Sequence, residues 1–124
     1  MANELRIILH GRPASKKNSK QIIHARGRSF IVPSKAYEAF KQYALYELLV
    51  YKRHLGKPID KEVTIEYKFY QKGKMTQDHD NAEASINDVL QAAGILADDK
   101  LIKHWSGEII GGANEWRTQI HIIW

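Results

Sequence analysis

Four aspartates flank one predicted helix. Residues 77–102 read QDHDNAEASINDVLQAAGILADDKLI, with Asp78 and Asp80 at the start of the helical pattern and Asp98 and Asp99 just beyond its end. Two aspartates two residues apart can aim oxygens at one hard cation such as Mg²⁺, and a later aspartate can add a third oxygen. Such an ion promotes phosphodiester cleavage because it activates water and stabilises charge on the phosphate. The pattern therefore favours a metal-dependent nuclease, although aspartates also cap helices and fill turns.

The positive charge of the chain is concentrated in its first half. The net charge is +5, but residues 1–61 hold 13 Lys and Arg against 4 Asp and Glu, whereas residues 62–124 hold 6 against 10. A basic half is typical of a surface that binds a polyanion such as DNA, and it is also compatible with an ordinary solvated surface. The expected phosphate contacts lie in the polar loop 12–20 and at the tip of the hairpin that follows: Lys16, Lys17, Lys20, Arg26 and Arg28.

Composition limits the other functional classes. The chain has 124 residues, 44% of them apolar, and no cysteine, which predicts one domain over 1–124 in a reducing cytoplasm, with no membrane span, secretion signal or small-molecule cofactor. Its six histidines lack the spacing of a zinc site.

Apolar periodicity predicts an α/β (α+β) fold, a mixed sheet of about five to six short strands packed with two helices. The first helix should start at Ser34 and stop at Gly56, and the second should be capped by Asp80 or Asn81 and end at Gly94. The expected strands are 5–11, a hairpin over 21–32 that turns at 25–28, then 62–73, and two final strands joined at the GGAN turn, 111–114.

Geometry constrains how the two aspartate pairs meet. A helix from about residue 81 to 93 is roughly 20 Å long, whereas residues 94–98 span only about 16 to 18 Å when extended. The pairs can come together if the loop folds straight back, if the helix is shorter, or if a partner subunit contributes.

The spacing of these acids resembles the RusA family of Holliday-junction resolvases. The resemblance is carried by D-x-D-N at 78–81, Asp88, the helix end QAAG and the Asp98–Asp99 pair, and it extends to the polar loop GRPASKKNSK after the first strand. It implies a homodimeric, Mg²⁺-dependent endonuclease that makes paired symmetric nicks in four-way DNA junctions during recombination and repair. Asp78, Asp80 and Asp99 would be its catalytic, metal-binding carboxylates and Asp98 a supporting ligand.

One position departs from the family. Some members carry a catalytic lysine four residues after the second Asp of D-x-D, where this chain has Ala84. Lys16, Lys17 or Lys100 would then supply the positive charge, or the reaction proceeds without it. Glu83 is expected to favour the helix dipole rather than to bind metal.

Two other functions fit the same residues. In one, the protein binds DNA without cleaving it, and the acids only cap helices and pair with the basic half. In the other, it is a metal-dependent nuclease for flaps, other branched DNA or RNA. The tryptophans at 105, 116 and 124 are expected in the core or an interface, with stacking on an unpaired base as the alternative.

Overall fold

The computed structural model describes residues 3–14, 20–25, 27–33, 35–73 and 79–124. In chain order the elements are β1 (Glu4–His10), β2 (Lys20–Ala25), β3 (Arg28–Pro33), α1 (Lys35–Leu55), β4 (Val63–Lys72), α2 (His79–Ala92), a 3₁₀ turn η1 (Asp99–Leu101), β5 (Ile102–Ala113) and β6 (Arg117–Ile123). Six strands and two helices confirm the predicted α+β class.

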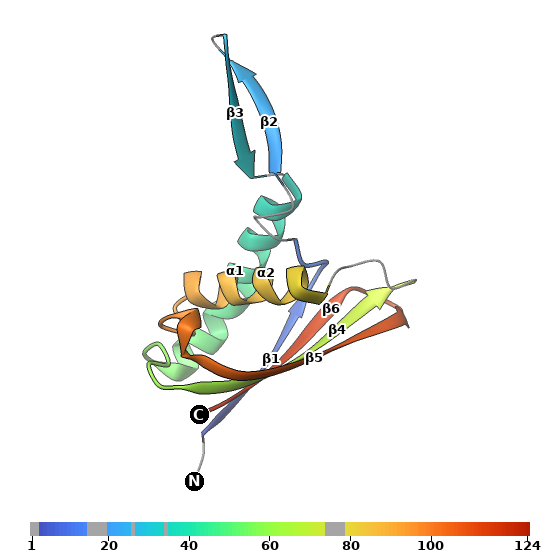
Figure 1. Ribbon diagram of the computed structural model, residues 1–124. Helices are drawn as coiled ribbons and strands as arrows, with labels where there is room; N and C mark the ends of the chain where they lie inside the picture. Colours follow the sequence, from blue (N-terminus) through green and yellow to red (C-terminus); the bar gives the residue numbers. More distant parts are fainter. Residues whose placement is uncertain (1–2, 15–19, 26, 34, 74–78) are drawn as a thin grey trace.

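The strands form two separate sheets. Four of them make a mixed sheet in the order β1-β6-β4-β5, in which only β4 and β5 run parallel, and β2 and β3 form an antiparallel hairpin of their own. The hairpin turns between Ala25 and Arg28, as predicted. It extends away from the four-stranded sheet and the helices (Figure 1).

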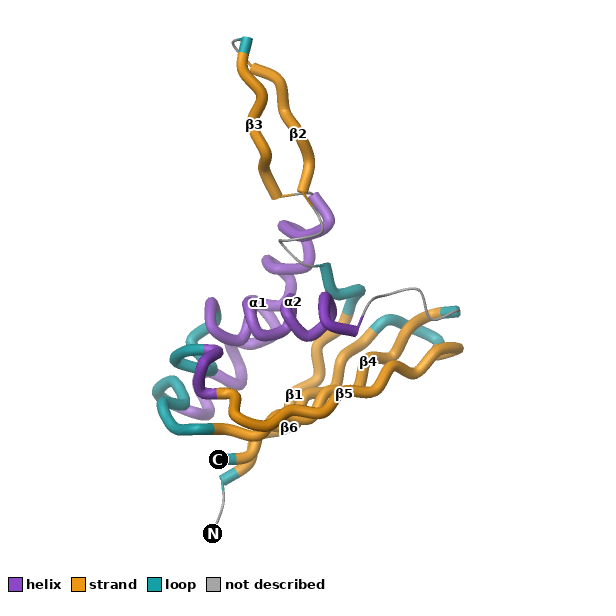
Figure 2. Tube along the Cα trace, in the orientation of Figure 1, coloured by secondary structure: helices purple, strands orange, loops and turns teal. Residues whose placement is uncertain are grey.

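Both helices lie on the same face of the four-stranded sheet (Figure 2). Strand β1 alternates exposed and buried residues, so that Leu5, Ile7 and Leu9 face the helices, and β4 and β6 alternate in the same way. Such alternation is expected of a sheet with one face packed and one face open. Helix α1 contributes Tyr37, Phe40, Ala44 and Leu48 to this core, and α2 contributes Ala82, Ile86, Val89 and Leu90.

The β1 edge of the sheet is closed by side chains of α1. The backbone N–H of His10 donates to Glu47 Oε1 at 2.8 Å, and the N–H of Ile8 donates to Tyr51 Oη at 3.3 Å. Unpaired amides on an edge strand are a template for further strand pairing. Helix α1 thus occupies amides that another strand would otherwise use.

The last two strands are joined at the GGAN turn, as predicted, but they are not neighbours in the sheet. Strands β5 and β6 follow each other in sequence across the GGAN turn, but β4 lies between them in the sheet. The crossover through α2 returns the chain parallel to β4, so β5 takes the outer edge and β6 fills the position between β1 and β4. Pairing between strands distant in sequence decides this order, and a local turn signal does not contain it.

Helix α2 begins earlier than predicted. It starts at His79, which places Asp80 within the first turn rather than at the cap. Its end agrees with the prediction, because Gly94 adopts a positive φ of 75° and the N–H of Ile95 donates to the carbonyl of Leu90 at 3.0 Å. This left-handed glycine reverses the chain immediately after the helix.

Candidate active site

A pocket of about 310 Å³ opens between α2, β4 and the start of β5. Glu83 and Asn87 lie one turn apart on α2 and reach the pocket from the helix side, while Tyr67 reaches it from β4. The complete lining is Tyr67, Glu83, Ala84, Asn87, Asp99, Ile102 and Trp105. The pocket therefore combines two carboxylates, an amide and a phenol with an aromatic side chain.

Asp99 reaches the pocket because the chain folds straight back after α2. Ile95 and Leu96 are fully buried behind the helix end, and Leu96 bridges to Ile59. The N–H of Asp99 then donates to Gln91 Oε1, in the last turns of α2, at 3.0 Å. The loop thus folds straight back and brings Asp99 to the middle of α2, while the meeting of the two aspartate pairs stays a prediction.

Asp98 has a different environment from its neighbour. It is the N-cap of η1, and its Oδ1 accepts a hydrogen bond from the N–H of Lys100 at 2.8 Å. This hydrogen bond holds the pKa of Asp98 below its ordinary value. Asp98 does not line the pocket, so its observed contact is a cap of the turn that presents Asp99.

The pKa of Tyr67 depends on burial and on the charges inside the pocket. Its hydroxyl donates a hydrogen bond to Asn87 Oδ1. Burial raises the pKa of Tyr67 above its ordinary value, and the negative charges of Glu83 and Asp99 raise it further. Tyr67 therefore remains a protonated donor at neutral pH. Glu83 and Asp99 line the same pocket as this hydroxyl, so their charges act on it from within one site.

Glu83, which was expected to favour the helix dipole rather than to bind metal, lies in the pocket. Its side chain is only 9% exposed and lines the pocket. The signal in the sequence was its spacing, because Glu83 follows Asp80 by three residues and precedes Asn87 by four, which places all three positions along one side of a helix. Ala84 lines the same pocket, so the site has no lysine at that position.

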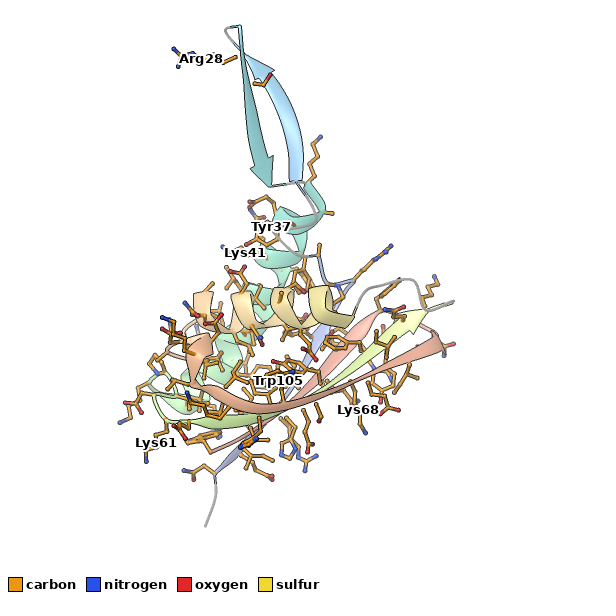
Figure 3. All side chains as sticks on the ribbon, viewed as in Figure 1. Arg28, Tyr37, Lys41, Lys61, Lys68 and Trp105 are labelled. Carbon is orange, nitrogen blue, oxygen red and sulfur yellow. The ribbon has the colours of Figure 1, made fainter. Side chains whose placement is uncertain are left out.

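Trp105 lies outside the core, so of its predicted placements an interface or a surface that stacks on a base fits it. Its side chain, labelled in Figure 3, is 61% exposed and lines the pocket, whereas Trp124 is partly buried against the core. Alternation along β5 could not indicate this, because an edge strand leaves side chains uncovered on both faces.

Several predicted site residues cannot be placed. Asp78, Lys16, Lys17 and Arg26 lie outside the described residues, and so do the side chains of Asp80 and Lys20. Arg28 is exposed and projects from the tip of the hairpin (Figure 3). The predicted set of metal ligands and phosphate contacts therefore stays a prediction.

The donor atoms of the pocket suit a hard cation. Within the part of the chain that the structure describes, no group of three or more His, Cys, Asp and Glu side chains is placed to hold a metal ion. The described pocket nevertheless offers only oxygen donors, from Glu83, Asp99 and Asn87, and Mg²⁺ prefers oxygen. Position 80 lies one helical turn before Glu83, where a further carboxylate can complete such a set.

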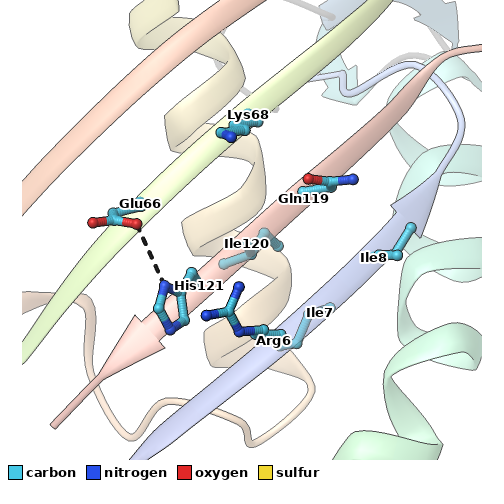
Figure 4. A pocket seen from close by; sticks show the side chains of 8 residues that line it. All are labelled: Arg6, Ile7, Ile8, Glu66, Lys68, Gln119, Ile120 and His121. Carbon is cyan, nitrogen blue, oxygen red and sulfur yellow. Dashed lines mark hydrogen bonds and ion pairs between the residues drawn. The ribbon is translucent and has the colours of Figure 1, made fainter.

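A second hollow, of about 300 Å³, lies on the open face of the sheet (Figure 4). His121 is its central polar residue, with Nε2 2.9 Å from Glu4 and Nδ1 3.4 Å from Glu66. Arg6 and Lys68 also line it. The hydrogen bond from His121 and the charge of Arg6 lower the pKa of Glu4. These contacts are satisfied within a mixed-charge surface, and the hollow lacks the buried carboxylate of the first pocket.

The fold and the first pocket define a small α+β protein with an oxygen-lined site at the crossover between two parallel strands. Among the described helices, none is both long enough and apolar enough to cross a membrane. A family model described as endodeoxyribonuclease RusA matches residues 10–123, and the chain belongs to this family. A comparison with curated proteins found no match. The family identifies the protein as an endodeoxyribonuclease, and nucleases of this family in general depend on a divalent metal.

Proposed function

We propose that the protein is a Mg²⁺-dependent homodimeric endonuclease that resolves Holliday junctions by paired symmetric nicks in DNA recombination and repair. The observation that carries the proposal is the position of Asp99, which the fold brings into one pocket with Glu83 and Asn87 of α2, in a chain of the RusA endodeoxyribonuclease family. This pocket supplies the oxygen donors that phosphodiester hydrolysis with a hard cation requires.

Asp78, Asp80 and Asp99 are the proposed catalytic carboxylates, and Glu83 is added to them from its burial in the pocket. Asp98 supports the site by capping the turn that presents Asp99. When bound, Mg²⁺ supplies Lewis-acid stabilisation of the phosphate and activation of the attacking water. Tyr67 keeps its proton and orients Asn87 through their hydrogen bond.

Trp105 is proposed to contact the substrate directly. Its exposed ring lies at the pocket, on the edge strand β5. An aromatic face of this kind can stack on an unpaired base at about 1–3 kcal/mol per base, and unpaired or loosely stacked bases occur at a junction centre. The basic residues Lys16, Lys17, Lys20, Arg26 and Arg28 would hold the phosphates of the arms.

The missing family lysine has a candidate substitute. Lys100 follows Asp99 directly and is exposed in η1. It can therefore place a positive charge near the pocket from η1, whereas the family lysine would lie on α2. Lys16 and Lys17 remain the alternatives from the polar loop.

A four-way junction and a linear duplex of the same sequence, each with Mg²⁺ or with EDTA, test the function. Paired nicks of the junction alone, and only with Mg²⁺, are expected. Binding without cleavage in Mg²⁺ would favour a non-catalytic DNA-binding protein, and preferred cleavage of flaps or RNA would point to a different nuclease.

Asp80→Asn tests the metal-ligand assignment. Asn is nearly isosteric with Asp and costs little in the first turn of a helix, so the variant should keep its melting temperature without metal. Loss of about 3 to 4 kcal/mol of transition-state stabilisation slows cleavage about 10² to 10³-fold. In EDTA the variant should bind the junction as tightly as wild type or somewhat more tightly, because one charge that repels the phosphate backbone has been removed. Cleavage at the wild-type rate would contradict the assignment.

Mixed subunits separate a site within one chain from a site shared between two. Asp99 lies with Glu83 and Asn87 of its own chain, which supports a site within one chain. A mixture of Asp80→Asn and Asp99→Asn subunits should therefore recover no nicking. Recovered activity, absent from either variant alone, would require carboxylates from both subunits.

A further inference from the structure

Helix α1 carries an exposed apolar stripe on the side away from the core. Tyr43, Tyr46 and Val50 are 52%, 73% and 70% exposed, and Leu49 beside them is 45% exposed. These four are the majority of the large apolar side chains that are exposed among the described residues. Contiguous exposed apolar surface of this kind commonly marks a protein interface.

A hollow of about 260 Å³ lies beside the first half of the same stripe. On α1 it is lined by Ala36, Ala39, Phe40 and Tyr43, and His10, Gly11 and Arg12 complete the lining. The N-terminal half of the stripe therefore has small side chains beside a hollow, at Ala36 and Ala39. Its C-terminal half has large exposed side chains, at Leu49 and Val50.

The stripe has the spacing of a helix-pairing seam. Its positions are Ala36, Ala39, Tyr43, Tyr46, Val50 and Arg53, separated alternately by three and four residues. This alternation averages 3.5 residues and keeps one side of a helix facing a partner helix. The inner face, with Phe40, Ala44 and Leu48, is already buried against the sheet and α2, so the outer seam is the exposed side of α1.

The seam is complementary to itself in the antiparallel direction. About a two-fold axis between positions 44 and 45, Val50 lies opposite Ala39, and Tyr43 lies opposite Tyr46. The protruding end of one helix then meets the recessed end of the other, as a symmetric interface requires. Aromatic pairs such as Tyr43 with Tyr46 contribute beyond the area that they bury.

Charge at the two ends of α1 favours the same orientation. The first turn carries Lys35 and Glu38, whose charges balance, whereas Lys52, Arg53 and His54 make the last turn basic. Antiparallel pairing brings Glu38 of one copy near Arg53 of the other, and it also opposes the two helix dipoles. A parallel pair would instead bring the two basic last turns together.

We propose that the outer face of α1 is the interface with a second copy of this chain, with the two helices packed antiparallel about a two-fold axis near positions 44 and 45. The proposal deepens the proposed function by naming the surface of the dimer that paired nicking requires. It rests on the complementarity of α1 and not on the chemistry of the pocket, so the two can fail separately.

Cysteine cross-linking tests the register directly, because the natural chain contains no cysteine. The double variant Ala39→Cys with Val50→Cys should form a covalent dimer under mild oxidation. Within one helix these positions are eleven residues, or about 16 Å, apart, which is beyond the roughly 7 Å limit for a disulfide. Neither single variant can join position 39 to position 50, so both should remain at background. A double variant that stays at the level of the single variants would overturn the register.

Sedimentation equilibrium tests the interface without cysteines. Val50→Lys places two charges in the proposed seam of each dimer and should weaken association on the order of a hundredfold. Ile8→Lys, on the open face of the sheet where Ile8 is 43% exposed, is the matched control and should leave association unchanged. Both sites are exposed in one chain, so both variants should fold with the circular dichroism of wild type. Dissociation by Ile8→Lys instead of Val50→Lys, or a wild-type monomer, would overturn the proposal.

Junction cleavage is not a readout of either experiment, so a protein that dimerises through α1 but cuts nothing would refute the proposed function alone.

Discussion

The backbone N–H of Asp99 donates a hydrogen bond of 3.0 Å to Oε1 of Gln91. This contact joins η1 to the last turns of α2, and it fixes the start of the return segment that carries Asp99 into the pocket with Glu83. Gln91 does not line the pocket itself, so its proposed role is to position Asp99.

Gln91→Met should slow cleavage of a four-way junction about tenfold. Methionine has a similar length but lacks the amide oxygen, so Asp99 loses an anchor, and a loss of about 1.4 kcal/mol of transition-state stabilisation corresponds to that factor. The Mg²⁺ concentration for half-maximal rate should rise as well. Single-turnover nicking over a Mg²⁺ series measures both. Gln42→Met on α1 is the matched control, and equal losses in the two variants would deny Gln91 a positioning role.

Glu83→Gln should reduce cleavage in Mg²⁺ by about 10² to 10³-fold, because it removes one anionic oxygen donor while it keeps the shape of the side chain. It should also lower the pKa of Tyr67, since the negative charge of Glu83 raises that pKa in the wild type. NMR titration of Tyr67 provides this second readout without metal or DNA.

Glu108→Gln, an exposed carboxylate on β5, is the control for Glu83→Gln. It should change neither the rate nor the titration of Tyr67. If Glu83→Gln lowers the pKa of Tyr67 but cuts at the wild-type rate, Glu83 lies in the pocket without taking part in catalysis.

Replacing Lys16 and Lys17 together by Ala should weaken junction binding and flatten its salt dependence. The slope of log K against log salt concentration should fall by about one unit for each lost phosphate contact. Fluorescence anisotropy over a salt series in EDTA measures both quantities. Lys57 with Lys61, in the loop after α1 and away from the hairpin, form the control pair (Figure 3). An unchanged slope would remove the polar loop from the DNA surface.

Stability should depend on pH through His10 and Glu47. His10 Nδ1 lies 2.7 Å from Glu47 Oε2, and this hydrogen bond raises the pKa of His10 above its ordinary value. The folded state therefore binds the proton more tightly, so the stabilisation is fully present below the unfolded pKa of about 6.5 and is lost as pH rises through the folded pKa.

Glu47→Gln isolates this contribution because its amide oxygen can still accept from the N–H of His10. The difference in unfolding free energy between wild type and variant should be larger at about pH 5 than at about pH 8.5, with a change below about 1 kcal/mol, since the His10 side chain is 47% exposed. Urea denaturation at the two pH values measures it. A difference independent of pH would exclude the charged pair.

Local patterns in the sequence determined most of the elements and part of the site. Alternation at period two predicted β1 and β4, and the buried faces of α1 and α2 followed from helical periodicity, because both patterns record which side of one element meets the core. The Asp98–Asp99 pair before an apolar strand was also predicted to belong to the site, and Asp99 lines the pocket.

Only the tertiary structure decided which partners these elements meet. The insertion of β4 between β5 and β6 arises from contacts between distant strands, and no turn residue encodes it. Burial of Glu83 likewise depends on the strand that lies beneath α2 and on the return of Asp99 to Gln91, since helical spacing gives the side of a helix but not what covers that side. For the same reason Trp105, on an edge strand, is exposed at the pocket although its residue type favours the core.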